Sequence, residues 1–587
     1  MAAGIYDYII VGAGSAGCVL ANRLSENPRH NVLLIEAGGS DARFWIKVPL
    51  GYAKTFTDPA VNWCYNTQPD PGLNGRSAYW PRGRVIGGSS SINAMAYLRG
   101  LPSDFDDWER AGATGWNWDT VRKTYEALES QIDSCGTKGS GPLVVSDVSD
   151  GMHPFIQHFF AAAREMGWNV ARNLNGEDAD GLMRMRSTVR KGRRWSVADA
   201  FLRPAKGRPN LRIISRALVE KVILEGGRAT GVAFRINGNL EIARAGKEVI
   251  LSAGAINSPQ ILQLSGIGPA SLLQRHGIPV LHDLPEVGKG LQDHLAISHY
   301  FRANQPTLNN KLGSRFGQIL AGLRYMLTRK GPLSVPVNQI SGYVRSTPGT
   351  PAPDVQVYCN PMSYRTSQSG TVGVDPEPGF LLCVQPSRPT SRGEVAIASA
   401  NPADAPLIQP NSLSTDEDCD MVIKASRLLQ GLAQTNAIRA VTKARLEPDI
   451  TAMDDGALLE NFRIRAGTVF HPSCTCRMGR DASTSVLDGR LRVHGVAGLR
   501  VVDASAFPNI TSGNTNGPTI MLAARAADLI LQDADGKGPS HETRQDRNFC
   551  SWQPATAPWR TLFHLRAADH GLRNHWRGRD LQCHIRP

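Results

Sequence analysis

The chain has 587 residues, a length that predicts two large domains or one large domain with insertions. Of its residues 41% are hydrophobic and 20% charged, an ordinary composition for a globular protein. No apolar run reaches the roughly 18–20 residues that cross a bilayer, and the amino terminus lacks the basic start of a signal peptide, so we expect a cytoplasmic protein. The net charge is +13, but the sequence contains no recognisable nucleic-acid-binding module, so we expect no nucleic-acid partner.

The first segment predicts a strand, a helix and a second strand. Tyr6–Gly12 (YDYIIVG) and Asn31–Gly39 (NVLLIEAGG) are short apolar runs typical of buried parallel strands. Residues 18–27 between them have helical spacing of their apolar side chains. This order indicates one βαβ unit.

Gly12, Gly14 and Gly17 form a G-x-G-x-x-G motif where this strand meets the helix, the context that gives the motif meaning. These glycines allow a tight turn, a close approach of the backbone to a pyrophosphate and close helix–strand packing. Glu36 ends the second strand, where an acid can bind ribose hydroxyls and would repel the extra phosphate of NADP. The alternative is a glycine turn without a ligand.

FAD is the dinucleotide that the sequence favours. An enzyme that passes electrons from nicotinamide to flavin usually has two such motifs, and no second one follows a predicted strand. GKGLQD (Gly288–Asp293) has the wrong third position.

Further along, residues 82–100 are rich in glycine and serine but too apolar for a linker. Short β-like segments recur over residues 210–255, and Asn257–Gly268 predicts a helix with a glycine-rich stop. Scattered prolines and alternating segments over residues 300–460 indicate a separate region that contains a sheet. Residues 492–505 predict another buried strand, and residues 518–532 a strong helix. Beyond residue 535 the composition changes: residues 543–587 hold eight arginines and three acids.

His471–Cys476 (HPSCTC) allows three interpretations. His471, Cys474 and Cys476 could bind zinc, but the spacing is narrow and no complementary ligand pair occurs elsewhere, so we expect no metal. A catalytic thiolate would need an electropositive pocket that a sequence cannot show. A neutral histidine suits the third role, general base, because its unperturbed pKa of about 6.5 lies near working pH. A histidine packed in the core is the remaining alternative.

Five separated stretches resemble the glucose–methanol–choline (GMC) oxidoreductase family, and the similarity runs from about residue 5 to about residue 533. The stretches are PRGRVIGGSSSINAMAYLRG, GAINSPQILQLSGIGP, HPSCTCRMG, RVHGVAGLRVVDASAFP and GNTNGPTIMLAARAADLI. Within the family the chain most resembles the bacterial FAD-dependent alcohol, choline and sorbose dehydrogenases.

The resemblance implies roles for named residues. His471 matches the family's histidine at the reactive edge of the flavin, and Asn514 matches a second active-site position occupied by His or Asn. Ile92 stands where some relatives link FAD through a histidine, so FAD should be bound non-covalently. The positions expected to contact FAD are Gly12, Gly14, Ser15, Ala16, Gly17, Glu36, Ala37, Arg84, Gly87, Gly88, Ser89, Asn93, Ala94, Val219, Ala253, Asp503, Ala504, Asn514, Pro518 and Thr519.

The resemblance also implies an α/β fold, α+β overall, with a discontinuous Rossmann-like FAD-binding domain (residues 1–155, 195–300 and 465–535). The substrate-binding domain, built on an antiparallel sheet, would comprise residues 156–194 and 301–464. Residues 536–587 would form a basic tail, disordered or atypical, that could bring the enzyme to the inner face of a membrane.

The expected reaction is oxidation of a primary or secondary alcohol to an aldehyde or ketone, with His471 as base. The expected partners are a small alcohol and an external electron acceptor, either a quinone or an artificial dye. An oxidase that uses O₂ is one alternative. A flavin-containing lyase of the hydroxynitrile type and a non-catalytic scaffold are two others.

Overall fold

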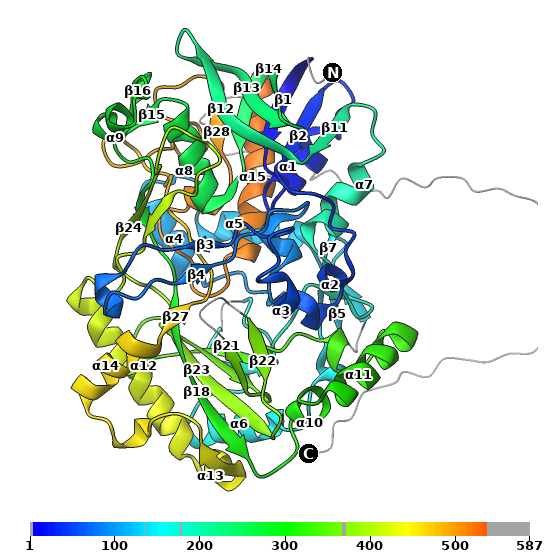
Figure 1. Cartoon of the computed structure of the whole chain (residues 1–587), viewed down its shortest axis with the longest axis vertical. Coiled ribbons are helices and arrows are strands. Elements are labelled where there is room, and N and C mark those ends of the chain that lie inside the picture. The colour runs from blue at the N-terminus through cyan, green and yellow to red at the C-terminus, as the bar shows by residue number, and fades with distance from the viewer. Residues whose placement is uncertain (1–3, 134–135, 177–178, 367–370, 537–587) are drawn as a thin grey trace, which may run out of the picture. The chain divides into compact units, whose positions relative to one another are not determined.

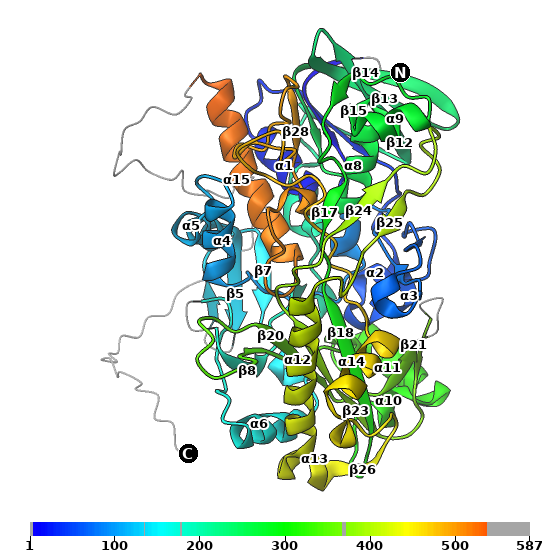
Figure 2. The same ribbon diagram turned by 90° about the vertical axis from the view of Figure 1, so that its left-hand side faces the viewer.

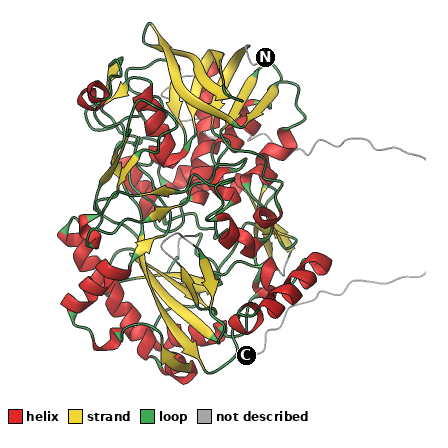
Figure 3. Cartoon of the chain, viewed as in Figure 1, coloured by secondary structure: helices red, strands yellow, loops and turns green. Residues whose placement is uncertain are grey.

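The computed structural model describes residues 4–133, 136–176, 179–366 and 371–536, whose strands gather mainly in two seven-stranded sheets (Figure 1). Helices, drawn red in Figure 3, lie beside both sheets, which confirms the predicted mixed α/β fold class. No helix in these residues is both long enough and apolar enough to cross a membrane. The predicted tail, apart from residue 536, lies outside the described residues.

The first sheet contains the predicted βαβ unit. In spatial order its strands are β11 (Leu211–Ser215), β2 (Val32–Glu36), β1 (Ile5–Val11), β14 (Asn239–Leu251), β13 (Arg228–Ile236) and β12 (Ala217–Glu225), with β28 (Leu499–Val501) also paired to β14. β11, β2, β1, the second half of β14 and β28 run parallel. The first half of β14 instead pairs antiparallel with β13. The sheet is therefore a parallel layer extended by an antiparallel hairpin.

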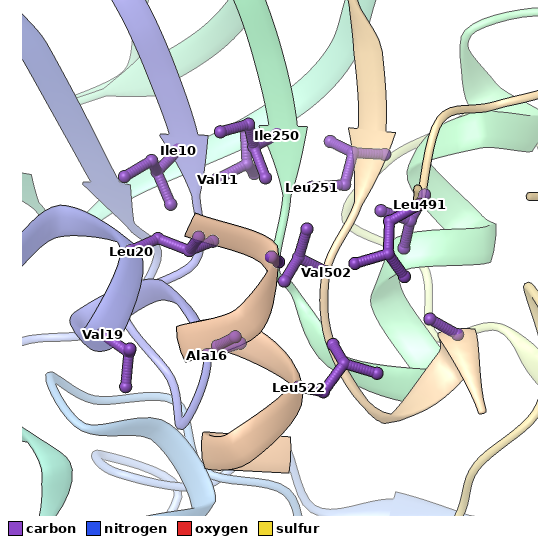
Figure 4. Packing of buried hydrophobic residues seen from close by; sticks show 14 of the residues in the cluster. Ile10, Val11, Ala16, Val19, Leu20, Ile250, Leu251, Leu491, Val502 and Leu522 are labelled. Atoms are coloured by element: carbon purple, nitrogen blue, oxygen red, sulfur yellow. The ribbon is translucent and has the colours of Figure 1, made fainter. Parts of the chain in front are cut away.

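Two helices cover the parallel layer: α1 (Gly17–Leu24) and α15 (Asn516–Ala534), which contact each other. Every residue of α1 except Arg23 is buried, as expected for a helix that is apolar on most of its surface. Figure 4 shows Val19 and Leu20 of α1 and Leu522 of α15 among the buried side chains next to Ile10 of β1. A Cβ on Gly17 would lie 1.8 Å from the carbonyl oxygen of Gly12, so only glycine permits this helix–strand packing.

The second sheet is antiparallel throughout. In spatial order its strands are β26 (Thr442–Arg445), β18 (Leu295–Ala303), β23 (Gly379–Pro386), β20 (Val355–Asn360), β19 (Ile340–Val344) and β8 (Gly181–Arg184), with β27 (Gly467–Thr468) also paired to β18. The helices α6 (Ile156–Glu165), α12 (Asp416–Gln434) and α14 (Asp455–Arg465) contribute to its apolar core. β18 spans residue 300, and the domain boundaries stay a prediction.

Two elements differ from the sequence-based expectation. The helix expected from Asn257 is α8 (Gly254–Leu264), which begins earlier because its free N–H groups find acceptors: the Gly254 N–H donates to Asp503 and the Ala253 N–H to the Ser258 hydroxyl. The strand expected over residues 492–505 is only the three residues of β28. It pairs with the last residues of β14, and that strand ends at Leu251.

Candidate active site

A cavity of about 1590 Å³ opens at the carboxyl ends of β1 and β2, where open parallel sheets bind their ligands. Its lining continues along the second sheet through Ser298, Tyr300, Tyr358, Leu381 and Cys383. Ligand pockets usually measure about 300–1,000 Å³. This cavity therefore has room for a dinucleotide and a second, smaller ligand.

Bare backbone forms the floor of the cavity beside β1. Gly12 has φ +100°, and Gly88, in the short helix η3 (Gly88–Ser91), has φ +52°. A Cβ on Gly88 would lie 2.6 Å from Cα of Gly14, so the two glycine segments touch without side chains between them. The Gly87 N–H fixes this contact by donating to the carbonyl of Ala13 (2.7 Å). Such a floor suits a pyrophosphate, which needs close backbone approach.

Glu36 lies at the end of β2 and lines the same part of the cavity. Its two carboxylate oxygens accept the N–H groups of Ala13 (2.8 Å) and Gly38 (2.7 Å), which fixes the side chain against the glycine turn. Burial raises the pKa of Glu36 to about 7, although these hydrogen bonds oppose the rise. Ribose hydroxyls would add further donors to this carboxylate.

Most of the expected FAD-contact positions line the cavity: Gly12, Gly14, Ser15, Ala16, Glu36, Ala37, Arg84, Gly88, Ser89, Asn93, Ala94, Val219, Ala253, Asp503, Ala504, Asn514 and Thr519. Three do not: Gly17 packs beneath Gly12, Gly87 holds the turn before η3, and Pro518 is buried in the first turn of α15. These three support the lining rather than form it.

Asp503 also has a structural task that the sequence did not reveal. Its carboxylate accepts the N–H of Gly254 (2.8 Å) and the hydroxyl of Ser258 (2.6 Å) from α8, together with the N–H of Ser505 (2.8 Å). It thereby joins the start of α8 to the segment after β28. Burial raises the pKa of this carboxyl.

His471 lies at the other end of the cavity, in the loop after β27. Its backbone N–H donates to Asp293 (2.7 Å), whose carboxylate also accepts the hydroxyl of Thr468. Phe470 before it has φ +69°, a left-handed conformation that is uncommon for a bulky residue. Arg82 donates to the carbonyl of Phe470 (2.7 Å) and so holds this strained residue in place.

A chain of hydrogen bonds fixes the tautomer of His471. His294 Nε2 lies 2.9 Å from the carbonyl oxygen of Ser387, which can only accept, so Nε2 carries the hydrogen. Burial lowers the pKa of His294 to about 4, which keeps its ring neutral and leaves a lone pair on Nδ1. His471 Nδ1 lies 3.0 Å from that atom and must therefore donate to it.

The Nε2 atom of His471 is consequently an unprotonated acceptor. Burial, His294 and Arg82 all hold the pKa of His471 well below its ordinary value, so the ring is neutral. Its Nε2 lies 3.1 Å from Nδ2 of Asn514, which donates to it. A proton acceptor and an amide donor thus stand side by side at the cavity wall.

Asn514 is held by a buried network from α4 (Pro102–Arg110). Asp104 of α4 accepts both the N–H (2.7 Å) and the hydroxyl (2.9 Å) of Ser512. The carbonyl of Ser512 accepts the hydroxyl of Tyr343 (3.0 Å). The Oδ1 atom of Asn514 is buried with no partner among the described residues, as is the hydroxyl of Ser252, and both residues line the cavity. Unpaired buried polar atoms of this kind indicate that a ligand completes the site.

The two cysteines of HPSCTC point away from this chemistry. Cys474 and Cys476 are fully buried in the core of the first sheet, and burial raises the pKa of Cys474 to about 11 and holds the pKa of Cys476 well above its ordinary value. Both thiols are protonated and inert. Their N–H groups donate to Ala504 (3.0 Å) and Ser505 (2.8 Å), so this segment pairs with the one that lines the cavity.

Sequence reasoning missed Asp293, His294 and Arg82. In GKGLQDH only the glycines suggest a motif, and the adjacent acid and histidine at its end are the signal that could have revealed two of them. The pairing of His294 with His471 crosses 177 positions of the chain, and no local pattern indicates it.

Comparison with known proteins places these features in context. The GMC oxidoreductase family is matched by its amino-terminal model over residues 6–296 and by its carboxyl-terminal model over residues 389–523. The mitochondrial choline dehydrogenase of Mus musculus is 40% identical over 565 residues, covering 94% of this chain and 92% of its own. The alcohol dehydrogenase [acceptor] of Pseudomonas putida is 41% identical over 541 residues, covering 90% and 96%.

Solved structures show the same fold. Pyridoxine 4-oxidase from Mesorbium loti superposes with a TM-score of 0.79 at 30% identity and covers 89% of this chain and 98% of its own. A formate oxidase superposes with a TM-score of 0.84 at 26% identity and covers 91% of this chain and all of its own.

Proposed function

The chain belongs to the GMC oxidoreductase family, and on that premise we propose that it oxidises a primary or secondary alcohol to an aldehyde or ketone with His471 as general base. The cofactor is FAD, bound non-covalently. The residues present fit it: bare glycine backbone and Glu36 line the dinucleotide end of the cavity. Ile92, buried at the cavity wall, offers no nucleophile for a covalent link.

FAD, when bound, supplies the hydride acceptor, and the chain must supply the proton acceptor. The observation that carries the proposal is the fixed tautomer of His471, whose Nε2 lone pair faces the cavity beside Asn514. The substrate hydroxyl would replace Asn514 as the donor to this Nε2, and it would accept a hydrogen bond from Nδ2 of Asn514. Loss of the hydroxyl proton to His471 prepares the carbon–oxygen unit to give up its hydride.

The overall reaction releases two electrons and two protons from the alcohol, and an external acceptor takes up both. We propose a quinone, or a dye in the laboratory, since relatives include an alcohol dehydrogenase [acceptor]. The oxidase alternative, in which O₂ is the acceptor, draws support from the pyridoxine and formate oxidases of similar fold. The lyase and scaffold alternatives have no such support among these proteins.

The substrate end of the cavity favours an uncharged alcohol with an apolar body. The second sheet lines it with Ser298, Tyr300, Tyr358, Leu381 and Cys383, and with no acidic side chain. The acidic residues in the lining are Glu36, Asp404 and Asp503, none of which belongs to this sheet. Tyrosine rings can bind a quaternary ammonium, so choline belongs in any substrate panel.

The test is an anaerobic visible spectrum of the wild type and of His471→Ala, each loaded with FAD and mixed with a panel of alcohols. We expect one class of alcohols to bleach the flavin bands of the wild type. In His471→Ala the bleaching should be slower by about 10²–10⁴-fold, the usual contribution of a general base, with FAD content unchanged.

Admission of air afterwards separates the two acceptors, because only an oxidase would recover its flavin bands at once. If His471→Ala reacts at the wild-type rate, the assignment of the base is wrong. If no alcohol bleaches the wild type, the proposed reaction is wrong.

A further inference from the structure

An amphipathic helix at the edge of the cavity presents its apolar side to solvent. α11 (Arg315–Thr328) follows the short helix α10 (Asn309–Leu312). Its exposed apolar residues are Phe316 (77% exposed), Ile319 (62%), Leu320 (58%), Leu323 (52%), Met326 (61%) and Leu327 (84%). Most large apolar side chains elsewhere in the described residues are buried, so this concentration on one helix marks a candidate interaction surface.

The spacing of these residues places them on one stripe. At about 100° per residue they span an arc of about 120°, with Arg315 and Arg324 just outside its two edges. The opposite side anchors the helix: Ala321 and Tyr325 are buried, and the Tyr325 hydroxyl donates to the carbonyl of Gly192 (3.0 Å). The apolar stripe is thus held outward by packing on its other side.

The charged residues of the chain segment that carries the stripe are all positive. Between Asp293 and Asp354 the sequence contains no acidic residue and seven basic ones: Arg302, Lys311, Arg315, Arg324, Arg329, Lys330 and Arg345. Five of these, at positions 311, 315, 324, 329 and 330, are exposed, and none forms an ion pair within the described part of the chain. An apolar stripe on a segment whose charges are all positive, five of them exposed and unpaired, matches an anionic lipid surface.

The helix that carries the stripe also lies beside the cavity. Gln318 of α11 lines the cavity, as does Trp45 of α2 (Phe44–Lys47). Phe44 and Trp45 are themselves 49% and 44% exposed, and tryptophan favours the interface between lipid and water. The segment Pro49–Gly51 after α2 contacts Pro332–Ser334 after α11, so α2 and α11 are joined through these segments, and Figure 1 shows them on the same side of the molecule.

We propose that α11 docks flat on an anionic lipid bilayer, with its apolar stripe in the headgroup region. Bilayer contact would place the adjacent cavity next to lipid, from which an apolar alcohol or a quinone could enter. The inference concerns the surface alone and does not depend on the proposed reaction. On the anchored side of the helix, Ala321 of α11 and Leu312 of α10 pack in one apolar cluster with Tyr364 of the strand β21 (Tyr364–Thr366), and Figure 2 shows these three elements close together.

The test is co-sedimentation of the full-length, FAD-loaded chain with vesicles of phosphatidylcholine and phosphatidylglycerol. We expect the wild type to bind, to bind less to phosphatidylcholine alone, and to be released by salt. Phe316→Ser/Leu320→Ser/Leu327→Ser should weaken binding at least about tenfold. The matched control is Leu240→Ser/Ile242→Ser, two exposed apolar residues of β14 (55% and 43%), which should bind like the wild type.

Turnover of a water-soluble alcohol with a soluble dye should be the same in all three proteins, which separates a surface effect from misfolding. The proposal is overturned if the wild type ignores vesicles, or if the triple variant binds them as the wild type does. It is also overturned if the wild type is a dimer that does not bind vesicles and the triple variant is a monomer. The stripe would then be an interface between two copies of the chain.

Discussion

At the residue scale, the proposed proton transfer depends on which nitrogen of the His471 ring carries a hydrogen. The carbonyl of Ser387 sets the tautomer of His294, and His294 sets that of His471. Neither His294 nor Ser387 lines the cavity. In the proposed reaction His294 is therefore a positioning residue, which acts on the substrate only through His471.

We expect His294→Ala to lower kcat by about 10–100-fold while KM and FAD content change little, because His471 would lose the acceptor that fixes its tautomer. His299→Ala is the matched control: His299 is equally buried and lies nearby in β18, but its ring faces Asn461 rather than His471. Steady-state kinetics across pH would check this. A positioning role predicts a shifted pH profile in His294→Ala alone, and equal losses in both variants would contradict it.

Glu36 gives a prediction about pH and stability in the flavin-free protein. Its pKa is about 7 when folded against an ordinary 4.5, so the folded state holds its proton more tightly than the unfolded state. The stability from this group is complete below about pH 4.5 and is lost as the pH rises towards 7, by about 3 kcal/mol in total.

Denaturant unfolding of the wild type and Glu36→Gln from pH 4.5 to 7.5 measures this loss. Across this pH range the free energy of unfolding of Glu36→Gln should rise by about 3 kcal/mol relative to that of the wild type. A constant difference would show that folding does not raise the pKa of Glu36. FAD should bind more weakly to Glu36→Gln, since a carboxylate accepts hydrogen bonds from ribose more strongly than an amide does.

At the element scale, short glycine-rich segments position the cofactor end of the cavity. η3 touches the turn between β1 and α1 at Gly88 and Gly14, and no side chain fits between them. These segments were recognisable in the sequence because a glycine turn between an apolar strand and a helix is typical of a dinucleotide site. The early start of α8 was not, because its cap comes from Asp503, far along the chain.

Gly88→Ala should therefore lose most of its FAD, by at least about tenfold in affinity, because its new Cβ would lie 2.6 Å from Cα of Gly14. Gly75→Ala is the control: Gly75 also has positive φ (+74°), but a Cβ there meets nothing within 4 Å. The control should lose only about 1 kcal/mol of stability and keep its flavin. The FAD content is measured on the purified proteins as the ratio of absorbance at the flavin band to absorbance at 280 nm. This ratio should be about equal in Gly75→Ala and the wild type. Full flavin in Gly88→Ala would refute the argument.

At the scale of the whole molecule, the described residues form two seven-stranded sheets with one large cavity lined from both. The sequence predicted both sheets, because strand periodicity and turn residues are local signals. It predicted His471 and Asn514 through the resemblance to a family. The partners that hold these two residues, His294 and Asp104, could not be predicted, because pairings between distant segments leave no local pattern.

The two sheets contribute differently to the site, and this difference affects how the substrate range of such an enzyme can change. Asn514 is held by Asp104 through Ser512, and the HPSCTC segment is held by Ala504 and Ser505, while Tyr300, Tyr358 and Leu381 project from the second sheet. Mutations at Tyr300 and Leu381 can change which alcohol fits without touching these anchors, whereas Tyr358 forms a side-chain hydrogen bond with Asn514. Directed evolution of a new substrate range should accordingly begin at Tyr300 and Leu381, and it should spare Tyr343 of β19, whose hydroxyl holds Ser512.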